Sequence, residues 1–104
     1  MITHLDHLVM TVKDIPRSVA FYTKVLGMDK VVFGAGRVAL SFGRQKINLH
    51  EEGKEFEPKA RRPTSGSADL CFITDAPIDS VTSSLVSHGI EIVAGPVSKT
   101  DGRS

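Results

Sequence analysis

An internal repeat limits the possible folds of this chain more than any other feature of its sequence. Matching positions in the two halves lie 62 residues apart without a gap: His7 and Asp69, Leu8 and Leu70, Val19 and Val81, and Gly27 and Gly89. We therefore expect the chain to build the same small unit twice.

The first unit begins with a predicted strand over residues 5–12, where β-branched and apolar residues form a short run. Side chains alternate between the two faces of a strand. Leu8, Met10 and Val12 therefore share a wholly apolar face that suits packing under a helix, and His7 belongs to the opposite face. A lone strand histidine is more often structural than a ligand, but the repeat makes this one a candidate for chemistry.

A helix follows the first strand. Asp14 is a predicted N-terminal cap, Pro16 suits the first turn, and apolar residues at three-to-four spacing predict a helix over residues 17–26, closed by Gly27. Three further strands are predicted over 28–33, 37–42 and 45–50, separated by glycine-containing turns. The first unit, residues 1–52, is therefore β-α-β-β-β.

The second unit, residues 68–104, repeats this pattern only in part. A polar connection over 53–67 leads into it, and the basic run at 59–62 suits a solvated linker better than an anion site. A strand is predicted over 68–74, a helix over 78–88 with Asp75 as its cap, and a strand over 90–94. Residues 96–104 carry no strand signal, so the second unit lacks its last strand or its last two.

Composition narrows the class of protein. The chain has 104 residues, enough for one domain, and its net charge of +1 gives no argument for nucleic acid or membrane as a partner. The single cysteine, Cys71, cannot form an intrachain disulfide and is predicted to be a core residue in a reducing compartment. With no long apolar run and no signal-peptide pattern, a cytoplasmic location is expected.

Three stretches together resemble the vicinal oxygen chelate superfamily, which includes glyoxalase I, fosfomycin- and bleomycin-resistance proteins and extradiol dioxygenases. They are the strand at 6–12, the helix at 18–28 and the strand end Asn48-Leu49-His50-Glu51. Residues 42–50, 55–60 and 66–74 look like the subgroup called glyoxalase domain-containing protein 5. The resemblance implies an α+β fold in which paired β-α-β-β-β units form a curved mixed sheet with outer helices, here with the second unit truncated.

The resemblance also implies a metal site. His7, His50 and Asp69 match three ligand positions for a divalent ion, which can be Zn, Ni, Co, Mn or Fe. Ligation by Asp69 and a hydrogen bond within the site remain alternatives. The fourth ligand of the family is usually a glutamate in a closing segment that this sequence lacks.

Arg37, Lys46 and Asn48 lie on polar strand faces, where they are candidates to bind an anionic substrate or are ordinary exposed positions. The resemblance implies a metal-dependent lyase, isomerase, transferase or dioxygenase acting on a small oxygenated molecule. A non-catalytic ligand-binding domain, as in bleomycin resistance, is the alternative, and a truncated copy of an active relative is a third. Because unpaired sheet edges invite pairing, a homodimer is expected.

Overall fold

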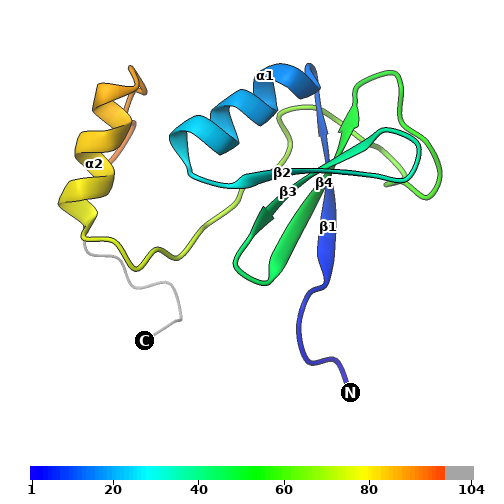
Figure 1. Cartoon of the computed structure of the whole chain (residues 1–104), viewed down its shortest axis with the longest axis horizontal. Coiled ribbons are helices and arrows are strands. Elements are labelled where there is room, and N and C mark those ends of the chain that lie inside the picture. The colour runs from blue at the N-terminus through cyan, green and yellow to red at the C-terminus, as the bar shows by residue number, and fades with distance from the viewer. Residues whose placement is uncertain (98–104) are drawn as a thin grey trace. The chain divides into compact units, whose positions relative to one another are not determined.

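The structure is a computed structural model that describes residues 1–97. In these residues the elements follow one another in the order β1 (His7–Val12), α1 (Ile15–Ala20), η1 (Phe21–Val25), β2 (Asp29–Phe33), β3 (Arg37–Phe42), β4 (Gln45–Glu51) and α2 (Ile78–Ser87) (Figure 1). The chain divides into two compact units, and the boundary lies between Leu70 and Cys71. The predicted connection over 53–67 therefore belongs to the first unit.

The first unit is the predicted β-α-β-β-β module of an α+β protein. Its strands form one mixed sheet in the order β1-β4-β3-β2. β1 runs parallel to β4, and β3 is antiparallel to both of its neighbours. The helical segment between β1 and β2 lies along one face of this sheet (Figure 1).

The helical segment starts as the sequence predicts. The carboxylate of Asp14 accepts a hydrogen bond of 2.9 Å from the backbone N–H of Arg17, which satisfies one of the free donors of the first turn. The sequence predicted one continuous helix, whereas the last part of the segment, η1, is a π-helix. Gly27, at a φ of +73°, then turns the chain into β2, a conformation that glycine adopts without steric cost.

The core of the first unit lies between the helical segment and the sheet. Its buried members are Met10, Met28, Leu40, Ile47 and Leu49. Partly buried side chains surround them from the helix, the strands and the end of the unit: Leu8, Val12, Ile15, Val19, Tyr22, Val38, Phe42 and Leu70. The apolar face predicted for β1 is therefore the core face, and His7 belongs to the opposite face, which we call the polar face.

The predictions for the second unit were wrong in three respects. Residues 68–74 and 90–94 form no strand: within residues 1–97 the sheet consists of β1, β4, β3 and β2, and a strand exists only as part of such a ladder. Cys71 is exposed, since the strand that was to bury it does not form. The N-cap of α2 is Pro77, without a side-chain hydrogen bond, so Asp75 is not the cap.

The helix predicted over 78–88 is present as α2. Of the segment predicted to lack a strand, residues 98–104 lie outside the described part of the chain. Within residues 1–97, no helix is both long and apolar enough to cross a membrane.

Candidate functional site

The strand register arranges the polar face in rows across the sheet. His7 is paired with Lys46 at the start of β1, and Thr11 is paired with His50 at its end. Four residues at about 3.3 Å each put the two histidines about 13 Å apart along the strands. The polar face therefore has two ends, which we call the His7 end and the His50 end.

At the His7 end, an acidic neighbour orients the imidazole. The Nδ1 atom of His7 lies 2.7 Å from a carboxylate oxygen of Asp6. This hydrogen bond and the charge of the ring lower the pKa of the Asp6 carboxyl below its ordinary value of 3.8. In the neutral ring, an Nδ1–H group that donates the hydrogen bond to Asp6 leaves the lone pair of Nε2 free for another partner.

Lys46 is paired with His7, and Asn48 lies midway between the two ends of the face. Asn48 stands beside Val9 in the register, two positions along the face from the His7–Lys46 pair. Its Oδ1 atom is buried without a hydrogen-bond partner in the described structure. The Lys46 ammonium lies 4.5 Å from the centroid of the Phe33 ring. An unpaired buried acceptor is uncommon in folded proteins and calls for an explanation.

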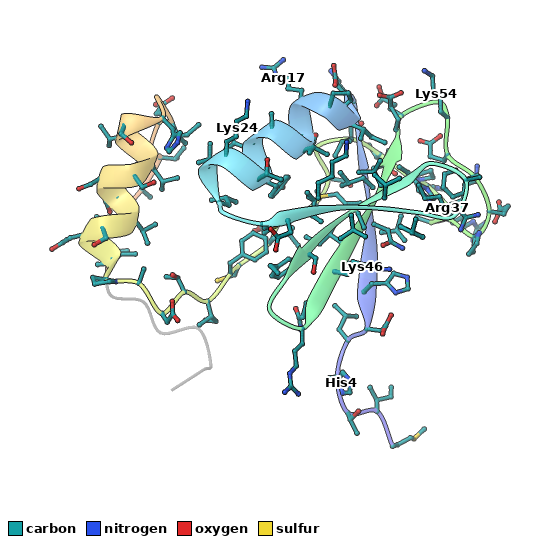
Figure 2. The ribbon with its side chains drawn as sticks, in the orientation of Figure 1. His4, Arg17, Lys24, Arg37, Lys46 and Lys54 are labelled. Carbon is teal, nitrogen blue, oxygen red and sulfur yellow. The ribbon has the colours of Figure 1, made fainter. Side chains whose placement is uncertain are left out.

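At the His50 end, the histidine is covered. His50 is only 4% exposed, and its Nδ1 atom is buried without a partner. The ring of Phe56, from the segment after β4, lies 4.3 Å from the His50 ring. The guanidinium carbon of Arg37 lies 4.5 Å from the centroid of the Phe56 ring. Figure 2 shows Arg37 beside the loop that follows β4.

The predicted metal ligands are not brought together in the described residues. His7 and His50 are too far apart to hold one ion through metal–nitrogen bonds of about 2.0–2.1 Å. Asp69 is exposed. Residues 1–97 contain no group of three or more His, Cys, Asp or Glu side chains that could hold a metal ion. The set of His7, His50 and Asp69 therefore does not fit as a single metal site within this part of the chain.

The three predicted substrate-binding residues share the polar face, as strand alternation indicated. Lys46 is paired with His7 at the His7 end, Asn48 lies midway between the two ends, and Arg37 lies at the His50 end. Sequence reasoning missed Asp6 and Phe56. The first had a usable signal, because a carboxylate directly before a candidate ligand histidine can orient it. Phe56 stands in a polar connection, and only the fold shows that it returns over the sheet.

The fold and the site together define a class of protein. A β-α-β-β-β module covers one face of a mixed sheet with its helix and leaves unpaired polar atoms on the other. The family model of the Glyoxalase/Bleomycin resistance protein/Dioxygenase superfamily matches residues 4–104. The chain belongs to this superfamily.

Similar proteins support this assignment. The chain is 57% identical over 100 residues to virulence protein STM3117 of Salmonella typhimurium, covering 96% of this chain and 69% of that protein. It is 55% identical over 96 residues to glyoxalase domain-containing protein RDO1 of Mycosarcoma maydis, covering 92% of this chain and 54% of that protein. The integron cassette protein VCH_CASS1 of V. cholerae matches with a TM-score of 0.94 and 57% identity, over 97% of this chain and 79% of that one.

More distant structures share the fold alone. They include lactoylglutathione lyase from Agrobacterium tumefaciens at 21% identity and a TM-score of 0.69, covering 88% of this chain and 75% of that one. The antibiotic binding protein TnmS3 from Streptomyces is 22% identical. The fosfomycin resistance protein FosX from Listeria monocytogenes, solved with Mn(II) and sulfate, is 18% identical.

Proposed function

We propose that this protein binds a small oxygenated organic molecule on the polar face of its sheet. The observation that carries the proposal is a pair of buried polar atoms without partners on that face, Oδ1 of Asn48 and Nδ1 of His50. Leaving such atoms unpaired costs free energy, about 1–3 kcal/mol for each group, so a ligand that pairs with them is favoured. Lys46 and Arg37 add positive charge on the same face, which favours an anionic ligand.

Glycolate, which carries one carboxylate and one hydroxyl, is a suitable probe. We expect it to shift the backbone amide signals of β1 and β4 in a nuclear magnetic resonance titration. The Asn48→Leu variant should lose these shifts, because leucine cannot accept or donate a hydrogen bond. Gln45→Leu, which changes an exposed residue at the start of β4, is the matched control and should keep them. Shifts confined to other elements would contradict the proposal.

A metal-dependent lyase or isomerase is the second candidate function, and the bond between Asp6 and His7 is the observation that favours it. Metal-ligating histidines usually donate their other ring N–H to a carboxylate or carbonyl, as His7 does here. The described residues hold no complete ligand set, so the remaining donors would come from outside them, for instance from a second copy in the expected homodimer. FosX, of the same fold, was solved with Mn(II).

Equilibrium dialysis against Mn, Zn, Ni and Co tests this second candidate. We expect one ion per chain or per dimer, and loss of binding in His7→Ala. His88→Ala removes an exposed histidine at the end of α2 and should leave binding unchanged. A protein that remains metal-free against all four ions would leave ligand binding without a metal as the function. The narrower resemblance to glyoxalase domain-containing protein 5 and the cytoplasmic location stay predictions.

A further inference from the structure

The ring of Phe56 contacts two other flat groups. The His50 ring and the Arg37 guanidinium each approach within 4.5 Å of the Phe56 ring centre. A group this close to the centre lies over a face of the ring, because edge contacts hold the centres further apart. The Phe56 ring therefore contacts both groups at once. We call the space that it fills the ring slot.

Three features favour a ligand over Phe56 as the occupant of the ring slot. The Nδ1 atom of His50 stays buried and unpaired although Phe56 contacts the His50 ring. Arg37 has no carboxylate partner within the described residues, where the only ion pairs are those of Asp6 with His7 and of Glu51 with Lys54. Phe56 itself remains 38% exposed and belongs to a segment without regular secondary structure.

We propose that the ring slot is a binding site for a planar, negatively charged group, such as an aromatic or conjugated carboxylate, and that Phe56 fills it when no ligand is bound. This inference rests on the proposed function, since it places part of the ligand at the His50 end of the polar face. The carboxylate pairs with the Arg37 guanidinium, whose planar fork matches its two oxygens. The ring of the ligand takes the place of the Phe56 ring against His50.

Phe56 and the ligand then compete for one place. A ligand that binds only the open state has an apparent affinity reduced by the fraction of molecules in which the slot is open. Phe56 is held by one aromatic contact and one cation–π contact. Contacts of this kind keep the slot closed most of the time, so removing the ring should tighten binding by about 5- to 50-fold.

Benzoate titration of the full chain, followed by nuclear magnetic resonance, tests this inference. Phe56→Ala should bind benzoate about 5- to 50-fold more tightly than the native chain. Phe21→Ala is the matched control, because Phe21 is similarly exposed at 36% and has one aromatic contact, with Tyr22. It should leave the affinity unchanged. Adding Arg37→Met to Phe56→Ala should weaken binding about 10-fold or more, whereas Arg44→Met, at an exposed turn, should not.

The native chain offers a measurement that needs no variant. Saturating benzoate should abolish the nuclear Overhauser contact between the rings of Phe56 and His50. Cyclohexanecarboxylate, which is charged but not planar, should bind more weakly than benzoate. Unchanged or weaker benzoate binding by Phe56→Ala, or a persistent ring contact at saturation, would overturn the ring slot. The proposed function would still hold in that case if glycolate shifts the amide signals of β1 and β4. If glycolate leaves these signals unchanged, the proposed function itself is wrong.

Discussion

Replacing Asn48 with leucine should stabilise the protein while removing a ligand-binding group from the polar face. The Asn48 Oδ1 atom is buried and unpaired. The neighbours of Asn48 across the sheet are Val9 on β1 and Ala39 on β3, both apolar, and Ala39 is 0% exposed. Leucine has the same branching at Cγ, and its methyl groups can pack against these apolar neighbours. An unsatisfied buried polar group costs about 1–3 kcal/mol, so its removal should raise stability.

The lower end of this range applies, because the Asn48 side chain as a whole is only half-buried. We expect the free energy of unfolding to rise by about 1 kcal/mol, or the melting temperature by about 4–8 °C. Urea unfolding with an unchanged m-value measures the effect. Gln45→Leu, on the exposed start of β4, should stay within about 0.5 kcal/mol of the native chain. A less stable Asn48→Leu protein would refute the reasoning, since the amide would then have contributed a hydrogen bond.

Two further predictions concern the core. Leu40→Ala should lower the free energy of unfolding by about 2–5 kcal/mol, because Leu40 is 0% exposed in the middle of β3. The control Val32→Ala changes a residue that is 60% exposed and should alter the free energy of unfolding by no more than about 1 kcal/mol. Urea unfolding of both variants measures these changes. Burial raises the pKa of the Tyr22 hydroxyl above its ordinary 10.0, because the folded protein favours the neutral phenol. The stability that the neutral phenol contributes is therefore fully present below pH 10 and is lost as the pH rises through the folded-state pKa. The phenolate absorbance of this single tyrosine reports the pKa, and Tyr22→Phe should remove that part of the pH dependence; a midpoint at or below 10 would contradict the burial argument.

The local signals in the first unit were strong enough to predict its elements. The alternation in β1 separated Leu8, Met10 and Val12 from the face of His7, and the Asp14 cap marked the start of the helix. In the second unit the same kind of signal failed at residues 68–74 and 90–94. An apolar run favours a strand, but a strand exists only where a neighbour completes its hydrogen bonds, and sequence periodicity does not supply that neighbour.

The sequence by itself determined which face of each strand is polar, because alternation is a local property of the backbone. It therefore placed His7, Arg37, Lys46, Asn48 and His50 on one surface. Only the tertiary structure decided how far apart they lie on it. The parallel register of β1 on β4 sets His7 opposite Lys46 and separates it from His50 by the length of the strand. The return of Phe56 over the sheet, which covers His50, likewise depends on a contact between side chains of separate segments that no local pattern encodes.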